Sequence, residues 1–214
     1  MSLLQYNSVP AERSVGCVFA ENFESNWHVQ ENGGAISGSP VINHGATFDG
    51  AADYITYRLQ GHEFNAANIS IVIEFYPDFN YSDNVECYFI DSTDPYRYII
   101  YKKPIGGGYQ LDIYLGNTQI ASILPATYGG SWLQSERNVL VVSGTSGATN
   151  AWLNGTQILT SDASAWTPDA PTELYVGSRF NATGLFDGVI SSVKVFQSLL
   201  TGEDAENYYT HGGV

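Results

Sequence analysis

The spacing of carboxylates is a first test for catalysis in this sequence. A retaining glycosidase needs two carboxylates about 5–5.5 Å apart, and one strand face can carry them as E-x-D-x-x-E. The sequence contains no such string. Glu74 lies inside an apolar, alternating segment, and no acidic residue follows it two or five positions later. This pattern is typical of an outward-facing polar position in a strand.

A second string has the residue types of a lyase. Residues 101–110 (YKKPIGGGYQ) resemble the Y-x-K-x-G-x-Y-x-Q signature of jelly-roll alginate lyases, but the spacing after Lys103 departs from it. The companion R-x-E-x-R motif, which would neutralise charge during such a reaction, is absent. The four histidines show neither metal-ligand spacing nor a nearby nucleophile motif. We therefore expect no enzymatic activity.

More residues of the sequence suit ligand binding than suit catalysis. Carbohydrate sites set aromatic rings against sugar rings and add hydrogen bonds from amides and carboxylates. The candidate ligand-binding residues are Tyr96, Tyr98, Tyr101, Tyr109, Trp132 and Trp166. No cofactor is required by any motif, but Ca²⁺ binds to loop carboxylates and carbonyls. The candidate Ca²⁺ ligands are Asp78, Asp83, Asp91 and Asp94, ahead of Asp162 and Asp169, and no EF-hand spacing ranks them.

The elements that would position these residues are short strands. The chain has 14% charged and 43% hydrophobic residues, with 22 Gly and 15 Tyr, which suits strands and tight turns. Alternation predicts strands over 69–76, 85–90, 96–101, 109–115, 118–124 and 138–143. The glycines at 106–108 predict one hairpin, and Asn154-Gly155 predicts another. Only residues 201–209 (TGEDAENYY) have a helical pattern, with Thr201 as N-cap.

Charge and cysteine content limit the partners. The net charge of −14 disfavours nucleic acid and anionic membranes. No apolar run approaches the ~20 residues of a membrane span, and the N-terminus lacks the pattern of a signal peptide. Cys17 and Cys87 are expected to be thiols, and the four N-x-S/T strings are attributed to chance.

Four segments together resemble a known family. Residues 46–55 (ATFDGAADYI), 69–77 (ISIVIEFYP), 139–158 (ending AWLNGTQI) and 174–209 follow the order of motifs in laminin G-like domains of the concanavalin A-like lectin/glucanase superfamily. The resemblance implies an all-β, two-sheet antiparallel jelly-roll sandwich with one short C-terminal helix. It also implies a jelly-roll domain over 17–214, preceded by an N-terminal arm or edge strand over 1–16.

Three functions remain open. The first is a non-catalytic binding or adhesion module that recognises carbohydrate or a protein surface, plausibly exposed on a particle. The second is a virion structural or capsid decoration protein without a glycan ligand, self-associating or bound to capsid or tail proteins. A polysaccharide-active enzyme is the third. Without a signal peptide, an extracellular or virion-surface location requires another route of export, such as host lysis by a phage; otherwise the protein is cytoplasmic.

Overall fold

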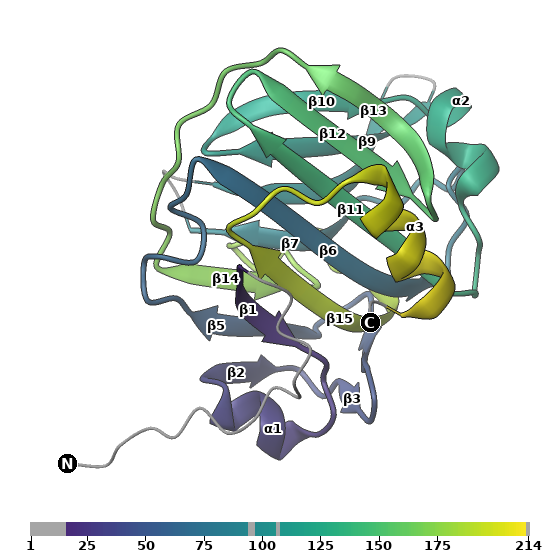
Figure 1. Cartoon of the computed structure of the whole chain (residues 1–214). Helices are drawn as coiled ribbons and strands as arrows, with labels where there is room; N and C mark the ends of the chain where they lie inside the picture. Colours follow the sequence, from purple (N-terminus) through teal and green to yellow (C-terminus); the bar gives the residue numbers. More distant parts are fainter. Residues whose placement is uncertain (1–15, 94–96, 106–107, 213–214) are drawn as a thin grey trace.

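Two antiparallel sheets lie face to face in this protein (Figure 1). The computed structural model describes residues 16–93, 97–105 and 108–212. In the eight-stranded sheet the order is β13 (Thr156–Asp162), β12 (Ala148–Leu153), β11 (Asn138–Thr145), β6 (Asn68–Pro77), β15 (Asp187–Phe196), β4 (Ala46–Asp49) and β3 (Val41–Ile42), and β1 (Cys17–Glu21) also pairs with β15. In the seven-stranded sheet it is β10 (Thr118–Ile123), β9 (Gly108–Leu115), β8 (Ile99–Ile105), β7 (Cys87–Ser92), β14 (Glu173–Val176), β5 (Tyr54–Arg58) and β2 (Gly34–Ser37). The predicted all-β sandwich is confirmed.

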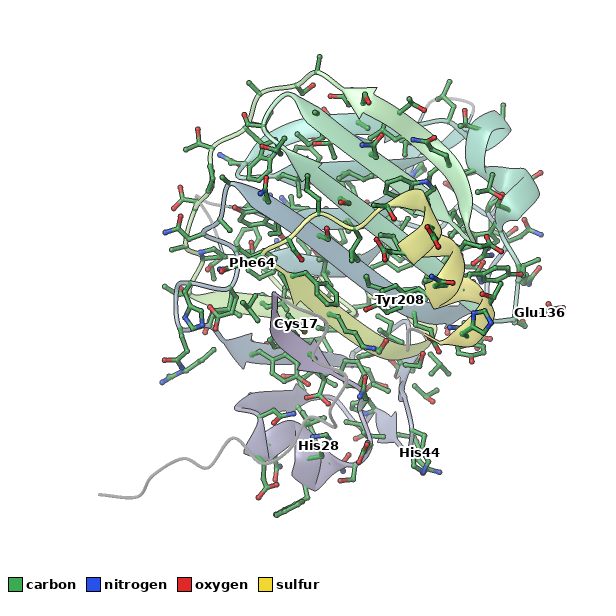
Figure 2. The ribbon with its side chains drawn as sticks, viewed as in Figure 1. Cys17, His28, His44, Phe64, Glu136 and Tyr208 are labelled. Carbon is green, nitrogen blue, oxygen red and sulfur yellow. The ribbon has the colours of Figure 1, made fainter. Side chains whose placement is uncertain are left out.

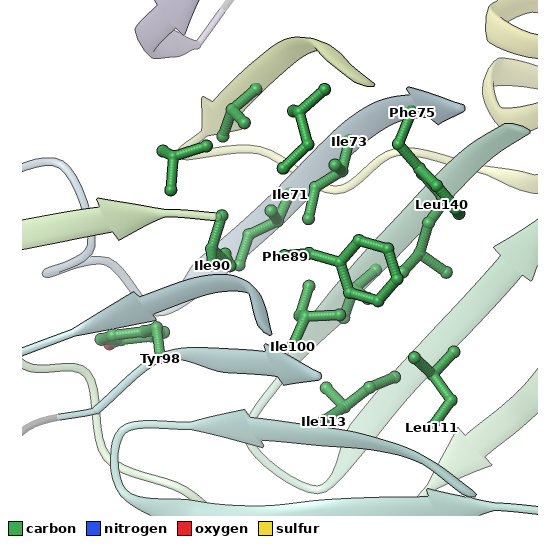
Figure 3. Close-up of a cluster of buried hydrophobic side chains, with 14 of the residues drawn as sticks. Ile71, Ile73, Phe75, Phe89, Ile90, Tyr98, Ile100, Leu111, Ile113 and Leu140 are labelled. Carbon is green, nitrogen blue, oxygen red and sulfur yellow. The ribbon is translucent and has the colours of Figure 1, made fainter. Parts of the chain in front are cut away.

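The core lies between the two sheets. Ile71, Ile73 and Phe75 of β6 alternate with outward residues, as predicted, and point toward Phe89 and Ile100 of the opposite sheet (Figure 3). A strand that buries alternate residues fixes its register, because a slip of one residue would turn its apolar side chains to solvent. The core therefore also fixes which residues of β7, β8 and β9 face outward.

Two hairpins agree with the turn signals in the sequence. Asn154 and Gly155 join β12 to β13 and both have positive φ, of 52° and 75°. The Asn154 amide is used inside the protein: its Nδ2 donates to the Ser131 carbonyl at 2.7 Å, and its Oδ1 accepts from the Val139 N–H at 2.7 Å. At the other hairpin Ile105 pairs with Gly108, while 106–107 lie outside the described residues.

Strand β15 departs from simple alternation. A regular alternation would put Val189, Val193 and Val195 on one face. A bulge between Ile190 and Ser192 shifts the register, so Ile190, Val193 and Val195 lie in the core while Val189 is half-buried. A bulge adds one residue to one strand and so exchanges the faces on either side of it.

The predicted C-terminal helix is present as α3 (Gly202–His211). Thr201 and Asp204 form a capping box, and Gly212 ends the helix at φ 75°. The prediction of a single helix is incomplete, because α1 (Asn26–Glu31), α2 (Pro125–Tyr128) and the 3₁₀ turn η1 (Gly129–Ser131) are also helical. These are too short to show helical periodicity, and α1 is held by its Ser25 cap and by buried Val29.

The cysteines and the N-terminal segment complete the fold. Cys87 is buried and Cys17 half-buried, and both are thiols, as expected. Residues 1–15 of the expected arm lie outside the described residues. None of the described helices is of a length and apolarity that would let it cross a membrane.

Candidate functional site

A cavity of about 300 Å³ opens on the outer face of the seven-stranded sheet. Its lining comes from β7, β8, β9 and the loops beside them. The lining residues are Glu86, Tyr88, Arg97, Ile99, Tyr101, Lys103, Tyr114, Asn117 and Arg179. The strand residues among them take the outward positions left when Ile100, Leu111 and Ile113 point into the core.

Three tyrosines form the apolar side of the cavity. Tyr88 and Tyr101 are directly paired across β7 and β8, and their rings stack with centroids 4.5 Å apart at 14°. The ring of Tyr114 lies 6.2 Å from that of Tyr101. Burial raises the pKa of Tyr88 to about 12 and raises the pKa of Tyr101 strongly. Both hydroxyls are protonated at neutral pH, as an unperturbed tyrosine hydroxyl is, and can donate hydrogen bonds.

A buried carboxylate organises the β9 side of this face. Asp112 is fully buried and accepts from Lys103 Nζ at 2.9 Å. It also accepts from the amides of Gln110 at 2.7 Å and Gln119 at 3.2 Å. A charge removed from water needs such partners, and in return it fixes the side chains that surround it. Lys103 is therefore held at the cavity with its charge neutralised.

The opposite wall depends on a second buried carboxylate. Asp91 is fully buried and binds Arg97 through both oxygens, at 3.2 and 2.5 Å. It also accepts from the backbone N–H of Phe180 at 3.1 Å. Burial raises the pKa of Asp91, and Arg97 acts in the opposite direction. One carboxylate thus fastens both Arg97 and a distant loop to the sheet.

That loop joins β14 to β15 (residues 177–186) and forms the rest of the wall. The Gly184 carbonyl accepts from the Tyr88 N–H at 2.8 Å, and the Gly177 N–H donates to the Phe89 carbonyl at 3.1 Å. Gly184 has φ 57°, and a Cβ there would lie 2.5 Å from the Tyr88 ring. The close approach of this loop to Tyr88 therefore requires glycine.

The predicted aromatic ligand-binding residues lie in different parts of the structure. Tyr101 lines the cavity, whereas Tyr109 is half-buried and faces Lys102, whose Nζ lies 4.7 Å from its ring centroid. Tyr98, Trp132 and Trp166 are core residues that are at most 6% exposed, so their rings lie between the sheets and do not line this cavity. Tyr96 lies outside the described residues.

Hydrogen bonds explain two of these burials. The Tyr98 hydroxyl donates to the Phe64 carbonyl at 2.9 Å and accepts from the Asp169 N–H, while Trp132 Nε1 donates to the Phe79 carbonyl. Internal partners for the polar atoms allow such rings to be buried at little cost. Tyr88 and Arg179 were not among the sequence candidates. Alternation in β9 places Tyr114 on the outer face, whereas a bulge in β7 obscures the face of Tyr88, and nothing local marks Arg179.

The structure does not gather the predicted Ca²⁺ ligands. Asp91 is taken up by Arg97, and Asp83 accepts from the Asn80 N–H at 2.7 Å. Asp78 is exposed and Asp94 lies outside the described residues. Within the described ranges no group of three or more His, Cys, Asp or Glu residues is placed to hold a metal ion.

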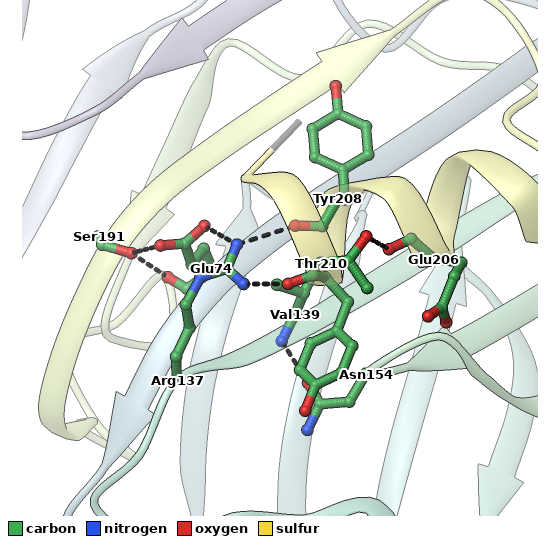
Figure 4. Close-up of polar contacts among 9 residues, drawn as sticks. Glu74, Arg137, Val139, Asn154, Ser191, Glu206, Tyr208 and Thr210 are labelled. Carbon is green, nitrogen blue, oxygen red and sulfur yellow. Dashed lines mark hydrogen bonds and ion pairs between the residues drawn. The ribbon is translucent and has the colours of Figure 1, made fainter. Parts of the chain in front are cut away.

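A second cavity, of about 370 Å³, lies on the outer face of the eight-stranded sheet, and its lining includes the ion pair of Glu74 with Arg137. Glu74 faces outward, as predicted, and accepts from Arg137 at 2.7 Å and from Ser191 at 2.9 Å (Figure 4). Arg137 also donates to the last carbonyls of α3, at Tyr208 and Tyr209. These contacts fasten the helix to the sheet, so this region is structural although its cavity is larger.

Tyr101 and Lys103 of the lyase-like string line the cavity, whereas the other described residues of the chemical strings lie elsewhere. Lys102 of the lyase-like string is fully buried and donates to the carbonyls of Asp83 and Val85. A Q-x-H string, Gln60-Gly61-His62, lies after β5 and does not contribute to the cavity lining. His28 lies within α1 and His44 follows β3, away from Tyr208 on α3 (Figure 2).

The match to a family model settles the class of the protein. Residues 49–206 match the model described as concanavalin A-like lectin/glucanases superfamily, and the chain belongs to this family. No sequence among curated proteins matches this chain.

Solved structures similar to this chain are numerous, and the three described next share at most 17% sequence identity with it. Domain 4 of an extracellular GH43 arabinanase from Geobacillus stearothermophilus, in complex with arabinotriose, has a TM-score of 0.58 at 17% identity, over 83% of this chain and 88% of that one. A botulinum neurotoxin type C structure, titled for its interaction with two ganglioside molecules, has a TM-score of 0.64 at 12% identity. Trypanosoma rangeli sialidase in complex with sialic acid has 0.58 at 11%.

The shared lengths limit what these likenesses say. The match covers 91% of this chain and 50% of the neurotoxin chain, and 82% of this chain and 29% of the sialidase. At these identities the likeness shows the fold alone, and this fold occurs in both binding domains and glycosidases.

Proposed function

We propose that this domain binds carbohydrate in the cavity on the seven-stranded sheet and that it does so without catalysis. The observation that carries the proposal is the composition of the cavity, in which a tyrosine cluster lies beside charged and amide groups. Sugars present both apolar C–H faces and hydroxyls, so their sites combine aromatic rings with hydrogen-bonding side chains. The volume of about 300 Å³ is at the lower end of the range for ligand pockets, which favours one sugar ring.

The charges of the cavity support binding over hydrolysis. A two-carboxylate mechanism needs both an acid and a nucleophile or base beside the bond that breaks. Among the described lining residues Glu86 is the one carboxylate, and Asp91 and Asp112 nearby are buried in ion pairs with Arg97 and Lys103. Among the described residues at this cavity, no second unpaired carboxylate is therefore present to complete the pair.

The structural neighbours supply independent support. Three proteins with this fold are described with arabinotriose, with sialic acid or as interacting with gangliosides, and each of these ligands is a carbohydrate or contains one. The virion hypothesis has no comparable observation behind it. A particle-surface location stays an expectation from the sequence.

Tyr114→Ala tests the proposal against a matched control. Tyr114 is half-buried at the cavity, whereas Tyr54 is half-buried on β5 of the same sheet and packs on Tyr175 away from the lining. In nuclear magnetic resonance titrations with a panel of mono- and oligosaccharides, we expect Tyr114→Ala to weaken binding about tenfold, equivalent to about 1.4 kcal/mol. Tyr54→Ala should bind like the wild type. Equal losses in both variants, or no binding by any saccharide, would contradict the proposal.

A further inference from the structure

Basic residues are concentrated at the proposed sugar site. The protein has eight lysines and arginines in total, and Arg97, Lys103 and Arg179 all line this one cavity. Arg97 is neutralised by Asp91 and Lys103 by Asp112. Arg179 forms no ion pair with any described residue, so it brings an uncompensated positive charge to the cavity.

The Arg179 guanidinium is held in place although its charge is unpaired. The backbone N–H of Arg179 donates to the Thr183 carbonyl at 2.9 Å, and the backbone carbonyl of Arg179 accepts from the Ala182 N–H at 2.8 Å. Its Cζ lies 5.5 Å from the centroid of Phe180, whose ring is also contacted by Arg97 at 4.8 Å. The loop is thus closed on itself and anchored by Phe180, so Arg179 loses less freedom when it binds a ligand.

One donor of Arg179 is buried without a partner. Its Nε is shielded from solvent and makes no hydrogen bond to the described residues. A buried N–H without an acceptor is costly, and an arginine fork matches the two oxygens of a carboxylate or sulfate. The guanidinium therefore has an unpaired charge and a buried Nε–H without an acceptor, and an anion beside it would neutralise that charge.

From this arrangement, and on the basis of the proposed function, we infer that the ligand is an acidic sugar whose carboxylate or sulfate binds Arg179. The sugar ring then lies over the tyrosine cluster of Tyr88, Tyr101 and Tyr114. Lys103 and Arg97, already neutralised by their own carboxylates, serve as hydrogen-bond donors to hydroxyls. Arg179 is the residue that distinguishes an acidic sugar from a neutral one.

Two negative contributions oppose an anionic ligand. The net charge of −14 repels it at long range, but screening at physiological ionic strength limits that repulsion to about 8 Å. Glu86 is closer: it is exposed, lines the cavity and makes no ion pair within the described residues. Glu86 should therefore weaken the binding of an acidic ligand and leave the binding of a neutral ligand unaffected. Removal of the Glu86 charge is a second test, with an expected effect opposite to that of removing the Arg179 charge.

The experiment compares acidic probes with neutral counterparts by calorimetric and magnetic resonance titration. Glucuronate, N-acetylneuraminate and galactose 6-sulfate are measured against glucose, the methyl ester of N-acetylneuraminate and galactose. We expect at least one acidic probe to bind at least tenfold more tightly than its counterpart. A response from the carboxylates alone, or from the sulfate alone, supports the inference and identifies the source of the anion.

Variants that remove single charges test whether the anionic group of the probe binds Arg179. Arg179→Gln should abolish the preference for the acidic probe, and Arg179→Lys should keep part of it because it retains the charge. Arg58→Gln removes an exposed charge from β5 of the same sheet and should have no effect. Glu86→Gln should increase the affinity for the acidic probe severalfold. Thermal unfolding of each variant confirms that the domain remains folded.

The outcomes separate the two proposals. Neutral and acidic probes that bind equally well, with Arg179→Gln unchanged, would overturn the inference and leave carbohydrate binding intact. An acidic preference that survives Arg179→Gln would also overturn it, because the anion would then be bound elsewhere. If no saccharide binds at all, the proposed function fails, and the inference fails with it.

Discussion

The two outer faces of this sandwich are built from similar antiparallel strands but are covered differently. On the eight-stranded sheet, α3 packs over an apolar cluster that includes Val72, Val139, Trp152 and Phe196, and Arg137 fastens the end of the helix. On the seven-stranded sheet, the outer side chains are tyrosines, cations and buried carboxylates around a cavity. An apolar face requires a cover, whereas a face of internally satisfied polar groups can stay accessible. The accessible face is the one available for recognition.

Removing Asp91 should have the largest effect on this contrast. Asp91→Ala leaves Arg97 without its counter-charge and the Phe180 N–H without its acceptor. Loss of one partner of a buried pair typically costs about 3–5 kcal/mol. We expect urea unfolding to show a loss of this order and saccharide binding to disappear, since Arg97 and the 177–186 loop both depend on Asp91. A variant of wild-type stability that still binds would show that the wall does not rely on this carboxylate.

Trp152→Ala should produce a loss of stability without a loss of binding. The Trp152 side chain is 8% exposed beneath α3, and a Cβ on Gly202 would come within 3.2 Å of its Nε1. Removal of a buried tryptophan ring costs about 3 kcal/mol. Denaturant unfolding should show this decrease, while the folded variant binds saccharide with unchanged affinity. Weakened binding here would mean that the two faces are coupled.

Arg137→Ala should loosen the C-terminal helix alone. It removes the donor to the Tyr208 and Tyr209 carbonyls and leaves Glu74 with Ser191 as its hydrogen-bond partner. Hydrogen bonds to charged groups contribute about 1.5–3 kcal/mol, and partial exposure lowers this to about 1–2 kcal/mol. Hydrogen exchange should accelerate in α3 and stay unchanged in β8 and β9. The exposed Arg58→Ala serves as control, and equal exchange in both variants would contradict the role of Arg137.

The two thiols offer a measurement that perturbs neither face. Cys87 is fully buried, and burial raises its pKa to about 12, so almost none of it is thiolate at pH 8. Cys17 is half-buried at the edge of the α3-covered cluster. Labelling with a thiol reagent should therefore modify Cys17 at least 100-fold faster than Cys87. Comparable rates would show that the core beneath the cavity opens readily.

The sequence was sufficient for the fold and insufficient for the site. Alternation in β6, the Asn154-Gly155 turn and the Thr201 cap are local signals, and each predicted its element. The faces of aromatic residues depend on more than local alternation. A bulge between Tyr88 and Ile90 sets which residues of β7 face outward, and Tyr98 is buried through bonds to Phe64 and Asp169, far along the chain.

The contribution of Arg179 was beyond prediction for a similar reason. It follows Asp91 by 88 residues, and it reaches the cavity because the Phe180 N–H binds that carboxylate. Nothing in its local sequence distinguishes it from an ordinary surface arginine. Tertiary hydrogen bonds, which leave no periodic pattern, brought the loop and the sheet together.

The 177–186 loop also has a consequence for how specificity can change in this domain. Its ends are fixed in the core: a Cβ on Gly177 would lie 2.8 Å from the Phe48 ring, and Phe186 is fully buried. Between these fixed ends, Arg179 reaches the cavity without taking part in either sheet. If the proposed function holds, substitution of Arg179 can alter ligand selection while both sheets keep their register, whereas Gly184 has to remain glycine because of its contact with Tyr88.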